Sequence, residues 1–146
     1  MNKNNYLIEL AESTRTDFGR VTFSRQSETQ KVFSAIWALE NEVNNGGFLQ
    51  YFSNSSGETA SFAPTALHHI GAGHCAAIVG QAIRIASVEP LPDSRDERHL
   101  VLRSLGEAAR AKLQDLDKQF FAYPDNLTEL LFGYVSAHPE VFGTID

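Results

Sequence analysis

The apolar positions of this chain recur with the spacing of an α-helix along most of its length. The cleanest run steps by three, four, four, three and four residues through Leu102, Leu105, Ala109, Leu113, Leu116 and Phe120. Such steps place side chains on one helix face, because an α-helix has about 3.6 residues per turn. No segment of four to eight residues alternates convincingly between apolar and polar side chains. The pattern therefore predicts an all-α protein.

A polar break with two glycines separates two apolar segments near residue 46. Ser27 with Gln30 matches a capping box, so a long helix should begin there. Residues 44–46 should end that helix, because Asn and Gly tolerate the left-handed backbone that terminates helices. An aromatic-rich short helix over residues 48–52 should follow and stop in the turn-forming run 53–57. The glycines are therefore expected to form a tight corner between two helices.

The remaining segments predict further helices of ordinary length. A short first helix should carry Tyr6, Leu7 and Leu10. Ser55 with Glu58 and Ser94 with Glu97 match two more capping boxes. The expected helices then cover residues 59–70, 75–87, 94–120 and 125–138. Pro64 should lie in the first turn of the first of these or at a kink, and the helix over residues 94–120 should be the longest. We expect a compact bundle of about six to seven helices in a single domain spanning residues 1–146.

Length and cysteine content place this chain among intracellular globular domains. It has 146 residues, enough to bury roughly two-thirds of its unfolded surface in one core. The single cysteine, Cys75, excludes an internal disulfide framework. No apolar run approaches the ~18 residues of a membrane span, and the N-terminus does not resemble a secretion signal. A soluble cytoplasmic protein is expected.

The charge balance argues against direct binding to nucleic acid. The chain carries 12 basic and 18 acidic side chains, a net charge of −6, whereas phosphate contacts need clustered Lys and Arg. A candidate acidic surface consists of Glu89, Asp93, Asp96, Glu97, Asp115 and Asp117. Basic residues interrupt it, and pairs such as Arg103 with Glu107 would partly cancel its charge. The pattern favours a solvated, salt-bridged surface over a continuous acidic one.

Histidines near the single cysteine offer the atom types of a metal site, but not its spacing. His68 and His69 diverge by about 100° on a helix, and His74 lies beyond a glycine turn. Cys75 lies among Ala76, Ala77 and Ile78, which favours a small buried core residue over a nucleophile. We therefore assign no metal, cofactor or catalytic residue here, and keep a metal site between His68 and Cys75 as a lesser hypothesis.

The polar residues around the glycine break suggest a brace or a pocket. Glu40 lies close to the apolar face and needs hydrogen-bond donors, which the backbone amides at the start of the Phe48 helix would provide. Glu40 and Glu42 diverge on the helix and do not form an acid/base pair. The alternative is a small-ligand or enzyme pocket around Glu40, Asn44 and Gln50, with His69 or His74 contributing.

The same segment resembles a bacterial helical family named after a DNA-mimic protein. The residues that match its motif are Glu40, Val43, Asn44, Asn45, Gly46, Gly47, Phe48, Gln50, Tyr51, Phe52 and Asn54. Weaker similarity continues through residues 66–72. The resemblance implies a compact all-α domain without known catalysis. In one branch of that family an acidic surface occupies the DNA-binding face of a regulatory protein.

A non-enzymatic interaction domain is favoured by the net negative charge, the lack of a catalytic pattern and the family resemblance. Its partner would be a basic protein, either a DNA-binding regulator or, for an immunity-type protein, a toxin. A homodimer is compatible with the same pattern.

Overall fold

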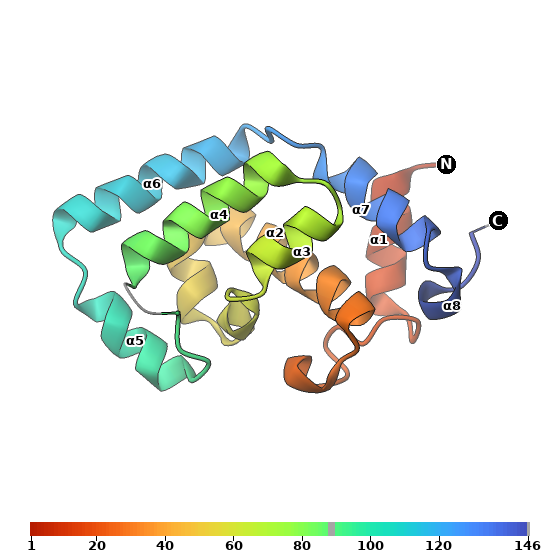
Figure 1. Ribbon diagram of the computed structural model, residues 1–146, viewed down its shortest axis with the longest axis horizontal. Helices are drawn as coiled ribbons and strands as arrows, with labels where there is room; N and C mark the ends of the chain where they lie inside the picture. The colour runs from red at the N-terminus through yellow and green to blue at the C-terminus, as the bar shows by residue number, and fades with distance from the viewer. Residues whose placement is uncertain (88–89, 146) are drawn as a thin grey trace.

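The computed structural model describes residues 1–87 and 90–145 (Figure 1). These residues form eight α-helices and two short 3₁₀-helices, with no β-strand among them. The all-α class is confirmed, whereas the expected count of six to seven helices is too low. The helices are α1 (Lys3–Glu12), η1 (Phe23–Arg25), α2 (Glu28–Ser53), η2 (Ser55–Thr59), α3 (Ala63–His69), α4 (Gly73–Ala86), α5 (Arg95–Arg103), α6 (Glu107–Phe121), α7 (Leu127–Ser136) and α8 (Pro139–Phe142).

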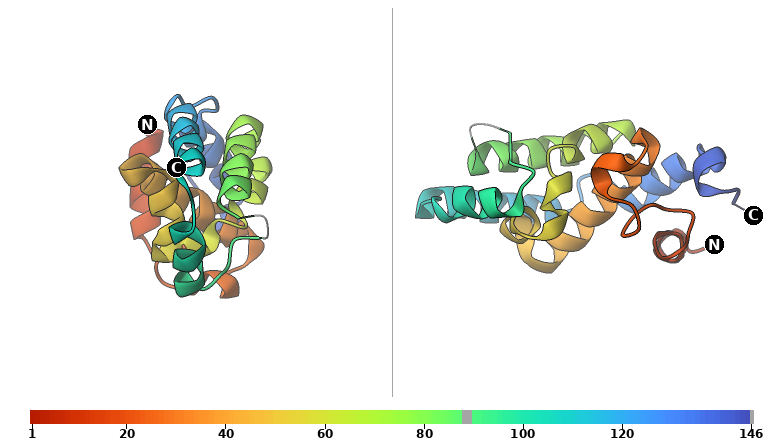
Figure 2. Two further views of the ribbon diagram at one scale, coloured as in Figure 1. Left: turned by 90° about the vertical axis from the view of Figure 1, so that its left-hand side faces the viewer. Right: turned by 90° about the horizontal axis from the view of Figure 1, so that it is seen from below.

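The helix α2 is the element around which the others pack. It contacts α3, α5, α6 and η2, and α4 fills the space between α3 and α6. Its apolar face is fully buried, with Phe33, Ile36, Leu39 and Phe48 at zero exposure. In Figures 1 and 2 the molecule is elongated, with α5 at one end and α1, α7, α8 and both termini at the other.

The chain changes direction at Gly47, inside α2. Gly47 has φ 81° and ψ −177°, a backbone conformation that only glycine adopts readily. Residues 44–46 remain helical, so the predicted helix end was too early, and the predicted corner lies at Gly47. The two helices expected from the sequence are thus two halves of α2, residues 28–46 and residues 48–53. The second half is the short aromatic segment.

The predicted long helix over residues 94–120 is wrong, because the chain breaks between α5 and α6. Arg110 turns back from α6 and donates from Nε to the Leu105 carbonyl oxygen (3.1 Å) and from Nη2 to that of Leu102 (3.0 Å). These bonds add a side-chain donor to the Leu102 oxygen, which also accepts from the Leu105 amide, and to the Leu105 oxygen in the connection between α5 and α6. Gly106 then starts α6 with an extended backbone.

Two of the three predicted serine caps are present. Ser27 Oγ accepts from the Gln30 amide, and Ser94 Oγ accepts from the Glu97 amide. The predicted cap at Ser55 is wrong, since η2 begins there as a 3₁₀-helix without a side-chain cap. Pro64 lies in the first turn of α3, where its missing N–H is not needed.

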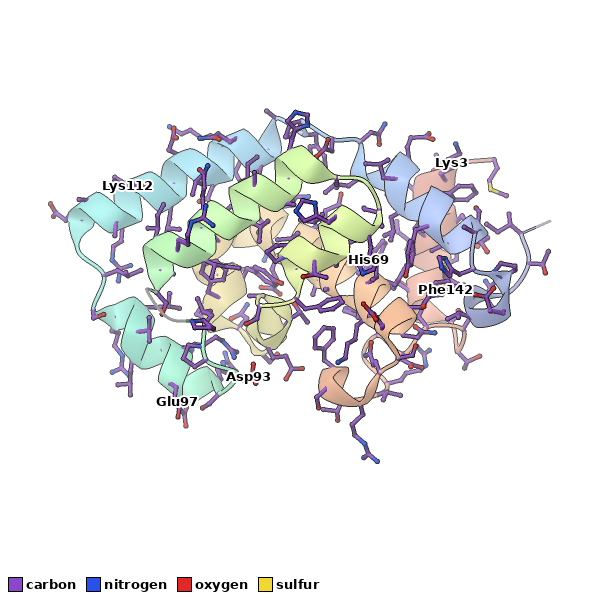
Figure 3. The ribbon with its side chains drawn as sticks, in the orientation of Figure 1. Lys3, His69, Asp93, Glu97, Lys112 and Phe142 are labelled. Carbon is purple, nitrogen blue, oxygen red and sulfur yellow. The ribbon has the colours of Figure 1, made fainter. Side chains whose placement is uncertain are left out.

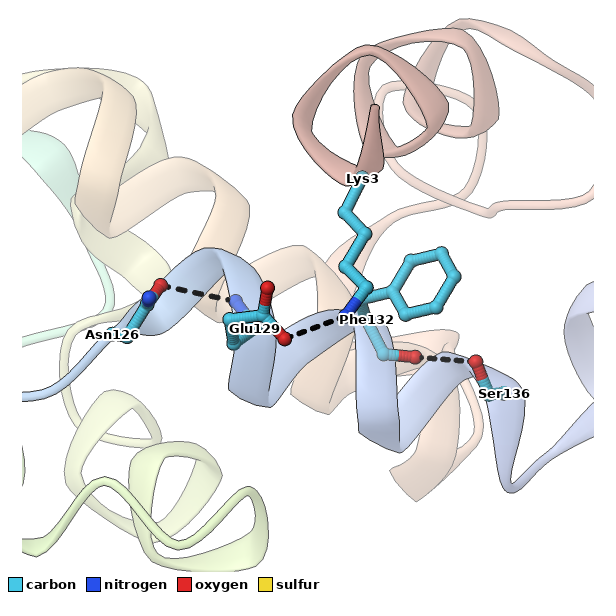
Figure 4. A network of polar contacts seen from close by, with 5 residues as sticks. All are labelled: Lys3, Asn126, Glu129, Phe132 and Ser136. Carbon is cyan, nitrogen blue, oxygen red and sulfur yellow. Dashed lines mark hydrogen bonds and ion pairs between the residues drawn. The ribbon is translucent and has the colours of Figure 1, made fainter. Parts of the chain in front are cut away.

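Contacts between α1 and α7 join the two ends of the chain (Figure 4). Lys3 Nζ lies 2.6 Å from Glu129 Oε2 and 5.2 Å from the ring centre of Phe132. Asn126 caps α7 by accepting from the Glu129 amide at 3.2 Å. Within residues 1–87 and 90–145, no helix combines the length and the apolar character needed to cross a membrane.

Candidate functional site

Asp117 caps the second half of α2 across the corner at Gly47. Its Oδ1 accepts from the Phe48 amide at 2.8 Å, where the broken helix leaves that amide without an intrahelical partner. A Cβ on Gly47 would lie 2.5 Å from Asp117 Oδ2. Glycine is therefore required both by the backbone angle and by the approach of this carboxylate. The predicted brace exists, but Asp117 supplies it and Glu40 does not.

Glu40 and Asn44 meet at Tyr123 instead. The Tyr123 hydroxyl donates to Glu40 Oε1 at 3.0 Å and accepts from Asn44 Nδ2 at 2.6 Å. Burial raises the pKa of Glu40, and the hydrogen bond from Tyr123 partly offsets that shift. Tyr123 has φ 50°, an uncommon conformation for an aromatic residue. The Tyr123 hydroxyl thus links the first half of α2 to the turn that follows α6.

Gln50 and Asn54 are directed to Glu42, away from Glu40. Glu42 Oε2 accepts from Gln50 Nε2 at 3.2 Å and from Asn54 Nδ2 at 2.7 Å. The structure thus divides the proposed pocket residues between two carboxylates, since Glu40 and Asn44 share Tyr123 while Gln50 binds Glu42. Of the other motif residues, Asn45 and Gly46 are exposed, and Phe48 and Phe52 are buried in the core.

The histidines near Cys75 are not brought together. His69 Nε2 lies 3.2 Å from Glu28 Oε1, and His74 Nδ1 lies 3.1 Å from Asp125 Oδ1. Asp125 Oδ2 also accepts from the Cys75 amide at 2.8 Å and so caps α4. Cys75 is fully buried as predicted, and burial raises the pKa of its thiol to about 11. No group of three or more metal-binding side chains occurs in the described part of the chain.

The predicted acidic surface separates into parts. Asp93, Asp96 and Glu97 are exposed at the start of α5, and Figure 3 shows Asp93 and Glu97 at the outer edge of the molecule. Asp115 is exposed on α6, where Gln119 donates to it at 2.9 Å. Asp117 is turned inward as the cap described above. Glu89 lies outside the described residues.

Basic side chains near this surface bind backbone carbonyl groups. Arg95 Nε donates to the Ser53 oxygen at 3.0 Å, and Arg103 Nε donates to the His99 oxygen at 3.4 Å. Arg98 donates from Nε to the Phe52 oxygen (2.7 Å), from Nη2 to the Asn54 oxygen (2.9 Å), and from Nη1 to the Pro92 (3.2 Å) and Asp93 oxygens.

The predicted salt-bridged surface is therefore wrong for this edge. Among the described residues, contacts within 4 Å between a basic and an acidic side chain join Lys3 to Glu129, His69 to Glu28 and His74 to Asp125, and Arg103 with Glu107 is not among them. Between residues 90 and 103, the carboxylates of Asp93, Asp96 and Glu97 have no ion-pair partner within 4 Å among the described residues. We call these three residues the acidic edge.

A family model described as DMP19-like protein matches residues 24–138, from the end of η1 through α7. This chain belongs to the DMP19-like protein family. No curated protein and no solved structure matches it in the corresponding comparisons. The matched region of this DMP19-like chain contains the corner at Gly47, its cap Asp117 and the acidic edge.

Sequence reasoning missed the positions in this DMP19-like chain that hold the site together. Arg98 is only 1% exposed, and its place four residues before Leu102 on the apolar face was a signal of burial. Asp117 was assigned to the acidic surface. Its contact with Phe48 could not be predicted, because the two residues are 69 positions apart in the sequence. Asp125 and Tyr123 carried no local pattern that could predict their roles.

Proposed function

We propose that this chain is a non-enzymatic domain that binds a DNA-binding regulatory protein through its acidic edge. Membership of the DMP19-like family supports a DNA-mimic role in protein interaction. On this proposal residues 1–146 act as one cytoplasmic domain, and the acidic edge occupies part of the surface by which the partner binds DNA. No chemical step and no cofactor are needed.

The observation that carries the proposal is the direction of the arginine side chains at this end of the molecule. Arg95 and Arg98 carry the positive charges closest in sequence to the acidic edge, and both donate to carbonyl oxygens at the end of α2. Arg98 is engaged through all three of its nitrogens, whereas Arg95 uses Nε alone, and neither arginine forms an ion pair with the described residues of the acidic edge. The neighbouring carboxylates are left free to accept from a partner.

The chemistry and placement of these carboxylates suit a partner that recognises phosphates. Asp96 and Glu97 are consecutive residues in the first turn of α5, where neighbouring side chains diverge by about 100°. Asp93 lies just before the helix, so the three carboxylates follow the loop into the first turn of α5. Arginine forks that bind phosphate also bind carboxylate in two-point contacts.

The test is a pull-down from a bacterial lysate with the wild-type chain and a variant that neutralises the acidic edge. In this variant, Asp93→Asn, Asp96→Asn and Glu97→Gln remove the three charges while keeping shape. The matched control carries Glu9→Gln, Glu12→Gln and Glu140→Gln, which remove three exposed charges at the opposite end of the molecule. Wild type and control should retain the same basic protein, and the first variant should lose it.

Salt and DNA then separate a DNA mimic from other acidic binders. The retained protein should be released as salt rises from about 50 mM to about 500 mM, because the exposed charges become screened. Duplex DNA that the partner binds should also displace it. A partner that salt releases but DNA does not would indicate another basic protein, such as a toxin. Equal loss from the edge variant and the control would refute the role of the acidic edge.

A further inference from the structure

A basic cleft of about 310 Å³ lies beside the acidic edge, between the second half of α2, α5 and the start of α6. It is lined by Leu49, Ser53, His99, Leu102, Arg103 and Arg110. This volume is at the lower end of the range for small-molecule sites in proteins. The cleft places two guanidinium groups beside the imidazole of His99, in a chain whose net charge is −6. The two guanidinium charges are opposite in sign to the net charge of the chain.

Both arginines have hydrogen-bond donors to spare in the cleft. A guanidinium group has five N–H donors, and Arg103 uses only Nε, in a long bond of 3.4 Å to the His99 oxygen. Arg110 uses Nε and Nη2 on carbonyl oxygens at the end of α5. Neither arginine has a carboxylate within 4 Å among the residues that the structure describes.

The other polar groups of the cleft are held in place by the end of α2. His99 Nε2 lies 2.8 Å from the Ser53 carbonyl oxygen, so Nε2 carries a proton and donates there. Ser53 Oγ in turn donates to the Gln50 oxygen at 3.2 Å. Leu49 and Leu102 add apolar walls, and Leu102 is almost fully buried. The cleft therefore combines fixed polar groups, two cationic forks and an apolar side.

The geometry points to a binding site for the phosphate group of a small organic phosphate monoester. A phosphate monoester carries a charge of about −1.5 to −2 at pH 7 and can balance both guanidinium groups, whereas a carboxylate balances one. Arginine forks also match the oxygen spacing of phosphate. Leu49 and Leu102 provide apolar contacts for the organic group of the ester. This site does not depend on the proposed role of the acidic edge.

The test is an NMR titration of the full chain with phenyl phosphate and, separately, with inorganic phosphate. Signals of the Arg103 and Arg110 side chains and of His99 should shift on addition of phenyl phosphate. Arg103→Gln should weaken binding about tenfold, the loss expected for one charge-assisted two-point contact. The matched control is Arg95→Gln, because Arg95 is also exposed on α5 and also makes one bond through Nε to a backbone oxygen. It should change the dissociation constant less than about twofold.

Arg103→Lys distinguishes a fork from a simple positive charge. It keeps the charge but loses the planar pair of donors, and should bind more weakly than wild type and more tightly than Arg103→Gln. Tighter binding of phenyl phosphate than of inorganic phosphate assigns the site to an ester, and equal binding assigns it to the free ion. Unchanged affinity in Arg103→Gln, an equal loss in Arg95→Gln, or signals that shift elsewhere would overturn the proposal.

Discussion

Arg98 should be the most costly single side chain to remove from the surroundings of the acidic edge. It is 1% exposed, and its guanidinium donates to four carbonyl oxygens, those of Phe52, Asn54, Pro92 and Asp93. The first two belong to the end of α2, where carbonyl groups lack helical partners. Arg98→Ala would leave the Phe52, Pro92 and Asp93 oxygens to whatever water can enter, while the Asn54 oxygen would keep its bond from the Gly57 amide. We therefore expect a loss far larger than that of a surface arginine.

The size of the loss follows from the hydrogen bonds and from burial. A hydrogen bond to a charged group contributes about 1.5–3 kcal/mol net, so four of them would suggest about 6–12 kcal/mol. Removing the guanidinium also removes its desolvation penalty of several kcal/mol, which offsets part of this loss. Breaking a comparable buried network typically costs 3–5 kcal/mol, and we expect about 4 kcal/mol for Arg98→Ala. Arg98→Lys should lower the free energy of unfolding by at least about 2 kcal/mol. One ammonium group cannot reach both the oxygens at the end of α2 and those that precede α5.

Urea denaturation followed by circular dichroism at 222 nm measures this loss. With a slope of about 2 kcal/mol per molar urea, the unfolding midpoint of Arg98→Ala should fall by about 2 M. The thermal midpoint should fall by about 10 °C. Arg95→Ala provides the control, since Arg95 is exposed and donates one hydrogen bond to the Ser53 oxygen, and it should cost less than about 1 kcal/mol. Equal losses for the two variants would refute the role assigned to Arg98.

Four further variants or measurements test the corner and the core. Gly47→Ala should cost about 1–3 kcal/mol by urea denaturation, because its φ is 81° and a Cβ would approach Asp117, and a neutral effect would contradict the required glycine. Asp117→Ala should cost about 1 kcal/mol through the lost cap on Phe48, and an unchanged midpoint would contradict this role. The pKa of Glu40 is raised in the folded state by burial, so ionisation of Glu40 disfavours folding as pH rises from about 4 to about 7. The stability of Glu40→Gln relative to wild type should therefore improve over that interval, and a constant difference would exclude the expected linkage. The Cys75 thiol, with its pKa raised to about 11 and no exposed surface, should react with a thiol reagent only when the chain unfolds, whereas fast reaction of the native protein would contradict its burial.

Local patterns in the sequence predicted the starts of helices better than their ends. The hydroxyl of Ser27 caps α2 as expected, because a cap depends on residues three positions apart. The break after α5 was missed because Leu102, Leu105 and Ala109 keep the helical rhythm across it. Arg110 stabilises that break through side-chain contacts, and no spacing rule distinguishes such an arginine from one in solvent.

The polar contacts at the candidate site depend on the packing of distant helices. The glycine motif indicated a corner, and Gly47 does form one, but the sequence could not identify the carboxylate that meets it. Asp117 and Glu40 were both available, and only the approach of α6 to α2 decides between them. The direction of the arginines at the acidic edge has the same origin, because the carbonyl acceptors lie more than forty positions away in the chain.

The caps on α2 and α4 have a consequence for folding during synthesis on the ribosome. The second half of α2 receives its cap from Asp117, and α4 receives its cap from Asp125. Both caps therefore form only after residues much later in the chain have been synthesised. A nascent chain that has exposed only its first hundred residues therefore lacks the caps on the Phe48 and Cys75 amides. We expect such stalled chains to be cleaved readily by protease and to become resistant once Asp125 has emerged; early resistance would show that packing alone suffices.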